Sequence, residues 1–599
     1  MADSPIHDEI DLPSCTILIE GSEMVKDYPL VSVRIIKEIN KISIAKLVLV
    51  DGDPTIPNFK ISESGDFDPG KKVEIKLGYH QKEELAFSGV VVSHDLKVRS
   101  NGGIKSSELV VTCKDNAFAL TLTRKSKNFV KKKDSDVLAE IINDYSGMTN
   151  KVDATTVEHP NLVQYNCTDW DFMLSRSDAN GFIVINDQGK LTIEKPDLSG
   201  TSVLKYNYGS DVISFTGEMD SAKQLDKVEF QSWDSEKLAL VKSTGSEPSP
   251  DNPLGDLSGK KLAEVHNKQN LELYTSIPED TNLLKSWADA HILHSRLSKI
   301  LGFVSSVGTT KAEVGKLIDL EGFGTHFNGK AYTTKVVHHF ERKFWGTEVG
   351  FGLRHQTYTE RGEIEGPSAL GMLPGISGLH IGKVKKIDTD PSNEYRVQVD
   401  IPFIEETGEG IWARLGQTHA TSDAGFYFYP NVGDEVVLGF VNNDPRHAVI
   451  LGSLYGKKNK SPFTPEAENK DKGIITKNNL KITFDDKDKI LILETPGGQK
   501  ISLDDKGKSL KIEDQNKNSI LLDSAGITLN SDKDITLKAG GKINITSTGV
   551  TEVKSSADFK ANGINVTIKA SAKIGLEGAT GELKSSGPLT VKGAMVNIN

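Results

Sequence analysis

Two adjacent histidines, His338 and His339, are the residues of this sequence whose chemistry most suggests a metal ligand. They end a run of β-forming residues, "AYTTKVVHHF", and neighbouring residues on a strand point to opposite faces of the sheet. One metal site cannot easily use both side chains, so we predict packing or surface roles for them. The three cysteines, Cys15, Cys113 and Cys167, are too few and too scattered for a zinc site or a disulfide framework.

A group of glutamates, Glu360, Glu363 and Glu365, has the residue type that glycoside hydrolysis needs. It stands in "TERGEIEG", a stretch bounded by Gly and Pro residues, where no fixed distance between carboxyl groups is expected. We therefore predict a solvated linker. The sequence contains no nucleophile elbow, HExxH, Walker loop or dinucleotide fingerprint. We predict no catalytic residue, no metal ligand and no cofactor, and hence no enzyme.

The aromatic run "GFYFYP" alternates Phe426 and Phe428 with Tyr427 and Tyr429, which places the two pairs on opposite faces of a strand. Such aromatics can stack bases or sugars. Few basic residues stand nearby, so packing in a core or between subunits is the favoured interpretation. The basic run "RKSKNFVKKK", residues 124–133, is predicted to be a solvated loop rather than a phosphate or partner site.

The length, the net charge and the distribution of apolar residues limit the class of protein. A chain of 599 residues exceeds one ordinary core, so several domains are expected. A formal net charge of -11 argues against general nucleic-acid binding. The N-terminus "MADSPIHDEIDLP" is acidic, and no run of about eighteen apolar residues exists. The chain is therefore expected to be made in the cytoplasm without a cleavable signal peptide.

The first ~370 residues read as alternating strands interrupted by helices. Residues 14–114 alternate in hydrophobicity as a barrel does. Helical spacing follows at residues 134–147, with Asp134 or Ser135 as N-cap, at residues 168–181, with Thr168 as N-cap, and at residues 281–300. We predict a hub region over residues 1–370, with two β-barrels at about 14–115 and 200–365 and a helical insert.

Five short strands between His380 and Tyr455 have the number and size of a small OB-type barrel. We predict an OB-fold domain over residues 371–456, a polar linker over 457–472 and a repeat domain over 473–599. The predicted fold class is thus mainly β with a few helices.

In the repeat domain an aliphatic pair recurs every eight residues, beginning with Ile527 and Leu529. Residues two apart leave the same face of a strand, so each octad supplies a narrow apolar stripe. One chain cannot close around that stripe, whereas three chains can turn it inward and pair their strands with one another. We predict an intertwined trimeric β-helix, or β-prism; a single-chain β-solenoid is the alternative. The predicted trimer core is Ile527, Leu529, Ile535, Leu537, Ile543, Ile545, Val553, Val566, Ile568, Ile574 and Leu576.

The order of these parts resembles the VgrG spike family, which is similar to a fused myophage baseplate hub and needle. Three hub stretches carry the match: "GKKVEIKLGY" with "FSGVV" (70–91), "CTDWDFMLSRSDANG" (167–181) and "FNGKAYTTKVVHHF" with "FGL" (327–353). The OB segment is more specific, and its family motif is Gly425, Phe426, Phe428, Pro430, Gly433, Asp434, Asp444 and Pro445.

The resemblance implies a mechanical function. A homotrimeric spike would join the hexameric inner tube protein and the baseplate components of a contractile injection system, and sheath contraction would drive it through an envelope. The linker has no room for the lysozyme domain of myophage needles. A PAAR-type tip protein is expected on Val596, Ile598 and Asn599, and it would have to supply any tip ion because the last histidine is His447. Effector cargo is a further possible partner, and nucleic acid is not expected.

Another class of function stays open at this point: a trimeric β-helical tailspike or adhesin that binds or degrades surface glycan. Such proteins usually present aromatic and acidic clefts, and the repeat domain has only Phe484 and Phe559 as aromatics. The sequence does not separate type VI secretion from an extracellular or thylakoid-bound contractile particle. In each case the spike would end in the target cell or the extracellular space.

Overall fold

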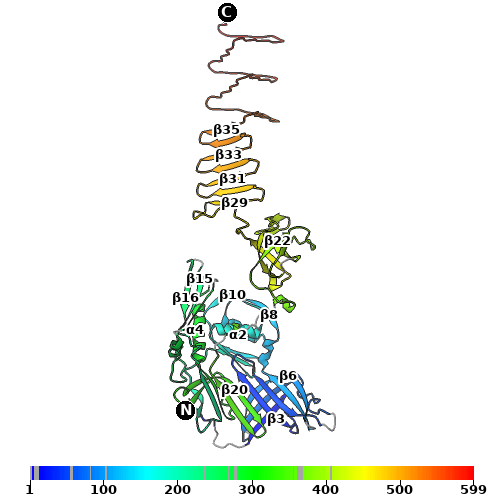
Figure 1. Cartoon of the computed structure of the whole chain (residues 1–599), viewed down its shortest axis with the longest axis vertical. Coiled ribbons are helices and arrows are strands. Elements are labelled where there is room, and N and C mark those ends of the chain that lie inside the picture. Colours follow the sequence, from blue (N-terminus) through cyan, green and yellow to red (C-terminus); the bar gives the residue numbers. More distant parts are fainter. Residues whose placement is uncertain are drawn as a thin grey trace. The chain divides into compact units, whose positions relative to one another are not determined.

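The computed structural model describes the whole chain except residues 1–2, 6–11, 54–57, 81, 102–103, 235–236, 267–268, 276–278, 355–356, 361–367, 405–407 and 599. The chain divides into two compact units, Met1–Ser453 and Leu454–Asn599. Figure 1 shows strands as the main regular elements of the first unit and of residues 471–530 in the second. Of the helices in the described residues, none has the length and apolar character needed to cross a membrane.

One 13-stranded sheet runs through both regions that the sequence indicates as barrels. The first region supplies β1 (Pro13–Ile19), β2 (Ser22–Glu23), β3 (Leu30–Glu38), β4 (Ile44–Val50), β5 (Lys72–Tyr79), β6 (Lys82–Asn101) and β7 (Ile104–Lys114). The second supplies β13 (Ser202–Asn207), β14 (Ser214–Met219), β18 (Ile300–Val307), β19 (Leu317–Glu321), β20 (Gly329–Glu341) and β21 (Phe344–Phe351). Antiparallel pairing of β20 with β3 joins the two regions.

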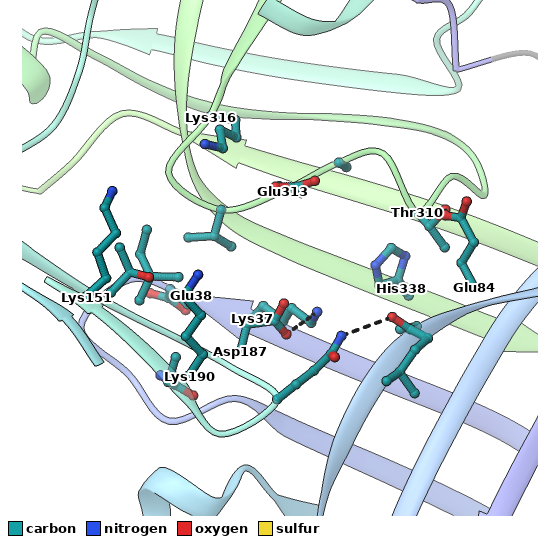
Figure 2. A pocket seen from close by; sticks show the side chains of 18 of the residues that line it. Lys37, Glu38, Glu84, Lys151, Asp187, Lys190, Thr310, Glu313, Lys316 and His338 are labelled. Carbon is teal, nitrogen blue, oxygen red and sulfur yellow. Dashed lines mark hydrogen bonds and ion pairs between the residues drawn. The ribbon is translucent and has the colours of Figure 1, made fainter. Parts of the chain in front are cut away.

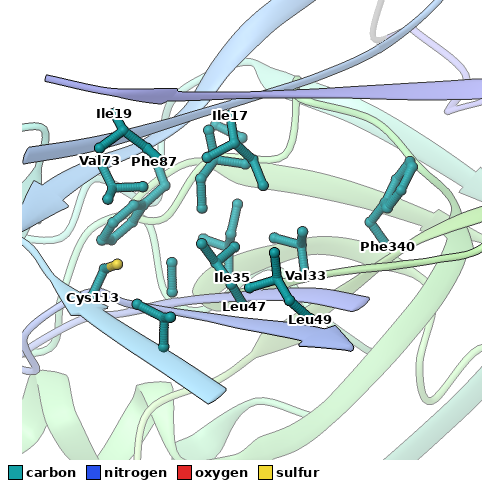
Figure 3. Packing of buried hydrophobic residues seen from close by; sticks show 14 of the residues in the cluster. Ile17, Ile19, Val33, Ile35, Leu47, Leu49, Val73, Phe87, Cys113 and Phe340 are labelled. Carbon is teal, nitrogen blue, oxygen red and sulfur yellow. The ribbon is translucent and has the colours of Figure 1, made fainter. Parts of the chain in front are cut away.

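Each region keeps its own hydrophobic core. In β4, Ala45, Leu47 and Leu49 are fully buried because alternate residues of a strand point to one face. Figure 3 shows Leu47 and Leu49 in a cluster with side chains of neighbouring strands, which includes Phe340 of β20. The second core is separate and contains Leu204, Tyr206, Ile300, Val304, Ile318, Val336 and Val349.

The insert between the regions contains η1 (Asn116–Thr121), β8 (Arg124–Lys133), α1 (Asp134–Asn143), β9 (Thr149–Val152), β10 (Glu158–Thr168), α2 (Asp169–Ala179), β11 (Ile183–Asp187) and β12 (Lys190–Glu194). Thr168 caps α2 as predicted, since its Oγ1 accepts a hydrogen bond from the Asp171 amide at 3.1 Å. For α1 the predicted cap is wrong: Lys133 is the N-cap, and Asp134 is the first helical residue.

The basic run 124–133 is a strand, β8, rather than the predicted loop. Its inward lysines have buried or half-buried acidic partners: Lys125 lies 2.6 Å from Asp169, and Lys127 lies 3.0 Å from Glu140. These ion pairs hold the β8–β10 ribbon against the helices. The lysines therefore serve packing within the insert.

A three-stranded sheet of β15 (Lys227–Asp234), β16 (Ala239–Thr244) and β17 (Asn270–Thr275) packs against α4 (Thr281–Leu297). The short α3 (Gly259–Ala263) and η2 (Glu264–His266) precede β17, and η3 (Tyr358–Glu360) and η4 (Ser368–Gly371) follow β21. Phe230 stacks on Trp287 of α4 with ring centroids 4.9 Å apart.

The OB region is a closed five-stranded barrel of β22 (His380–Lys386), β23 (Val397–Asp400), β24 (Ile411–Leu415), β27 (Glu435–Phe440) and β28 (Ala448–Ser453). The small β25 (Ala420–Thr421), β26 (Ala424–Gly425) and η5 (Val441–Asn443) lie between the barrel strands. These five strands are the ones the sequence predicts, and the mainly β fold class is confirmed.

Candidate assembly surface

The second unit begins with seven consecutive antiparallel strands: β29 (Asp471–Ile475), β30 (Lys481–Asp485), β31 (Ile490–Glu494), β32 (Lys500–Asp504), β33 (Ser509–Glu513), β34 (Ser519–Asp523) and β35 (Gly526–Asn530). Each strand pairs with the next strand of the same chain. The expectation that strands pair only with those of neighbouring chains is therefore wrong for residues 471–530.

Side-chain-capped turns favour the in-chain pairing, and most of them are capped by aspartate. After β30 the Asp485 carboxylate accepts hydrogen bonds from the amides of Lys487 and Asp488, at 3.0 and 2.9 Å. Asp514 accepts from the amides of Asn516 and Asn518 in the same way, at 2.8 and 2.9 Å. Asx turns of this kind reverse the chain sharply and bring consecutive strands together.

The register of these strands builds one continuous apolar face. Residues opposite one another form a first row of Ile474, Ile482, Leu493, Ile501, Ile512, Ile520 and Leu529. A second row, two residues away and hence on the same face, is Phe484, Leu491, Leu503, Leu510, Leu522 and Ile527. We call these two rows the apolar face. The opposite face is mainly polar, with Thr483, Ser502 and Lys511 in its central row and Ile492 and Leu521 as exceptions.

The apolar face is open in the single chain. Ile501 is 37% exposed and Ile512 is 42% exposed, although both stand in the middle of a strand. No other element of this chain packs on the face among the described residues of this unit, since 471–530 are followed only by residues without secondary structure. Contiguous exposed apolar residues of this kind are typical of association surfaces.

Beyond β35 the in-chain ladder stops. Residues 531–598 are all described and contain no strand, and Figure 1 draws them as an unpaired zigzag. Their turns are capped by serines instead of aspartates, as where the Ser547 hydroxyl accepts a hydrogen bond from the Gly549 amide at 3.1 Å. Apart from such turns, residues 531–598 form no strand ladder within the chain, and their aliphatic pairs stay exposed.

Of the residues predicted for the trimer core, some lie on β35, the last paired strand, and the others lie beyond it. Ile527 and Leu529 lie on β35 and end the two rows of the apolar face. The other nine lie beyond the ladder and are more than half exposed in the single chain: Ile535, Leu537, Ile543, Ile545, Val553, Val566, Ile568, Ile574 and Leu576. Their burial between chains stays a prediction. Of the predicted tip contacts, Val596 is 48% and Ile598 is 89% exposed, and Asn599 lies outside the described residues.

The eight-residue repeat does not indicate the rows between residues 474 and 522. A different period marks them: Ile482, Ile501 and Ile520 are 19 residues apart, and so are Asp485, Asp504 and Asp523. One period is a strand, a turn and the returning strand. This spacing would have indicated in-chain hairpins.

The OB motif residues shape loops of the barrel. Gly425 has a φ of +140°, and a Cβ there would lie 2.4 Å from the His419 carbonyl oxygen. The Gly433 amide donates to Val384 O at 2.8 Å, and Asp434 Oδ2 accepts from the Asn431 amide at 2.8 Å.

The remaining motif residues divide into buried and exposed. Pro430 is buried, and the buried Asp444, which precedes Pro445, accepts hydrogen bonds from Arg446 Nε and Nη2 at 3.0 and 2.7 Å. Phe426 and Phe428 are more than half exposed.

The two histidines have separate environments, as predicted. His338 is buried, its Nδ1 lies 3.1 Å from Thr347 Oγ1, and burial lowers its pKa to about 3. His339 Nε2 lies 3.1 Å from Glu341 on the surface. No cluster of three or more potential metal ligands occurs in the described part of the chain. The side chain of Glu360 and all of Glu363 and Glu365 lie outside the described residues.

A pocket lies where the first region, the insert and the second region meet, and Figure 2 shows its charged lining. Lys37 Nζ bonds to Asp187 at 2.6 Å, and Lys151 bonds to Glu194 at 2.7 Å. Lysines and carboxylates both line the pocket in similar numbers, so it has no dominant charge. Its residues tie the three parts together.

Comparison with known proteins defines the class. A family model described as the type VI secretion system/phage-baseplate injector OB domain matches residues 380–455. The type VI secretion system spike protein VgrG1b of Pseudomonas aeruginosa is 21% identical over 424 residues, which are 66% of this chain and 55% of that protein. The actin cross-linking toxin VgrG1 of Vibrio cholerae is 34% identical over 80 residues, 12% of this chain and 7% of its own length. These matches confirm the resemblance to VgrG spikes.

A second family model, described as the Alg8 N-terminal domain, matches residues 9–342, and the chain belongs to this family. The chain spans about half or less of the length of the curated relatives it matches.

Two solved structures are similar at low identity. A tail protein of prophage MuSo2 from Shewanella oneidensis has a TM-score of 0.44 at 11% identity, over 57% of this chain and 98% of that chain. A component of the E. coli type VI secretion system has a TM-score of 0.35 at 13% identity, over 73% of this chain and 99% of that chain.

Proposed function

We propose that this chain is the homotrimeric central spike of a contractile injection system. The observation that carries the proposal is the apolar face, which is complete along seven strands and uncovered in one chain. Covering one Val, Leu or Ile side chain contributes about 1.5–3 kcal/mol, so two rows of such residues strongly favour association.

Three copies suit the width of the face. Each strand presents at most two apolar side chains, and three such narrow faces would close around one axis as a prism. From Ile474 to Leu529 each side of the prism would be the sheet of one chain. From residue 531 onward the chains would wind around one another, because only neighbouring copies can supply the ladder that one chain lacks.

The hub gives the spike its attachment. Each chain holds two cores in one sheet, so three copies present six β regions, which matches a hexameric inner tube. Baseplate components would surround the hub, and a PAAR-type protein would cover the apolar end at Val596 and Ile598. Cargo would travel with the assembled spike.

The proposed work is mechanical. The chain is made in the cytoplasm, joins the particle and is driven through the target envelope when the sheath contracts. Stiffness comes from the shared ladder and the buried rows, and the chain has no catalytic step of its own. The relatives named as type VI secretion spikes support this role.

Contractile particles isolated from cells that express the chain test the proposal. Gold-labelled antibodies against hub residues 1–370 should mark one end of the inner tube in electron micrographs. Label spread along the sheath, or particles that carry no label, would contradict the assignment. Release of reducing sugar from peptidoglycan or polysaccharide by the purified chain would instead favour a glycan-degrading tailspike.

A further inference from the structure

The end of the repeat domain has a charge opposite to that of the rest of the chain. Residues 559–599 contain five lysines and two glutamates, with no arginine or aspartate. Their formal charge is +3, which leaves -14 on residues 1–558 of a chain whose total is -11. Three copies would place fifteen lysines and six glutamates on this short segment.

The lysines occupy positions next to the aliphatic residues of the repeat. Lys569 directly follows Ile568, and Lys573 directly precedes Ile574. Lys592 follows Val591 in the same way. Because neighbouring residues on an extended chain point to opposite sides, lysines beside inward aliphatics point outward. This step depends on the proposed trimeric spike, which decides the inward side.

Ion pairs neutralise only part of this charge. Lys560 lies 3.1 Å from Asp558, and Lys584 pairs with Glu582. Within the described segment 559–598, Lys569, Lys573 and Lys592 form no ion pair. The proximal sheet, β29–β35, holds lysines of both kinds: Lys487 bonds to Glu468 at 2.7 Å and Lys506 to Asp488 at 2.9 Å, whereas Lys489 and Lys508 form no ion pair among the described residues.

We propose that the outward lysines of residues 559–599 bind the anionic, phosphate-bearing surface of a membrane. Lysines near an anionic lipid surface are attracted to it over about one Debye length. The negative charge on residues 1–558 is repelled by the same surface, so the spike meets the membrane with its distal end first. Single-stranded nucleic acid is the less suitable anion, because base stacking needs aromatic side chains and Phe559 is the segment's single one.

Vesicle sedimentation of the full chain tests the proposal. Binding to vesicles that contain phosphatidylglycerol should exceed binding to pure phosphatidylcholine by at least about tenfold and should fall at high salt. Replacing Lys569, Lys573, Lys584 and Lys592 with Gln should abolish that preference. The matched control replaces Lys487, Lys489, Lys506 and Lys508 with Gln, which removes the same charge from the proximal sheet and should preserve binding.

Four results would overturn the proposal: equal binding to both vesicle types, unchanged binding by the distal variant, an equal loss in the proximal control, or release from vesicles by duplex DNA at equal phosphate concentration. Molar mass measured on the same samples separates this proposal from the spike itself. A chain that is not trimeric contradicts the proposed spike. A trimer that does not bind anionic vesicles contradicts only the proposal that the distal lysines bind a membrane.

Discussion

Ile501 of β32 and Ile512 of β33 lie directly opposite one another, and both side chains leave the sheet on its uncovered face. The same relationship recurs from strand to strand, so the unit of the repeat is a cross-strand aliphatic pair. In the proposed trimer, other copies of the chain cover this open face.

Replacing Ile501 with Asp should prevent that assembly. In a trimer the substitution would bury three unpaired carboxylates, each costing about 3–5 kcal/mol. We expect a monomeric molar mass by light scattering. Ser502→Asp, on the opposite face of the same strand, should remain trimeric; a trimer for the Ile501 variant would contradict inward packing.

The distal octads can be tested separately with the double variant Ile535→Asp and Ile543→Asp. Six charges would then face the axis, a cost that no surface ion pair offsets. We expect protease to digest residues after 530 rapidly in this variant and slowly in the native chain. Thr536→Asp with Asn544→Asp, at the outward positions, should resist as the native chain does.

The N-cap of α2 makes a measurable contribution to hub stability. Thr168→Ala removes the hydrogen bond to the Asp171 amide and should lower the free energy of unfolding by about 1 kcal/mol. Thr168→Ser keeps an acceptor at the same place and should restore most of the loss. Denaturant unfolding of the full chain, followed in the hub transition, measures both.

Burial of His338 makes hub stability depend on pH. The folded-state pKa is about 3, because burial disfavours the charged ring, while the unfolded value is about 6.5. The unfolded chain therefore binds the extra proton between these values, and stability falls as pH falls from about 6.5 toward 3, by up to about 1.4 kcal/mol per pH unit.

His338→Gln should reduce the dependence of the free energy of unfolding on pH. Fluorescence of the nearby Trp345, whose ring centroid lies 6.0 Å from that of the imidazole, can follow unfolding. His339→Gln is the matched control, because its ring is exposed and pairs with Glu341 on the surface. An unchanged slope in the His338 variant would contradict a neutral buried imidazole.

The sequence predicts the parts of the fold that depend on local chemistry. Thr168 and Asp171 have the spacing of a capped helix start, and the turn at Gln188 and Gly189 joins β11 to β12 as the "NDQG" signal indicates. The five barrel strands of the OB region follow from alternation alone.

Other features depend on tertiary partners that spacing does not reveal. The lysines of β8 resemble a solvated loop until Asp169 and Glu140 are placed beneath them. Asp134 resembles an N-cap, but its carboxylate bonds instead to Arg176 and Asn180. In the repeat, the aliphatic pairs of the 19-residue hairpins resemble octads, and the turn residues between them, such as Asp485 and Thr495, favour pairing within the chain.

The most direct test of the account is the molar mass of the full chain in solution by light scattering, beside a version that ends at Lys470. A trimeric prism predicts three times the chain mass of 65.3 kDa for the full chain and fewer than three copies per particle for the truncated one. A monomeric full chain would mean that the apolar face is covered without other copies, and it would contradict the shared prism.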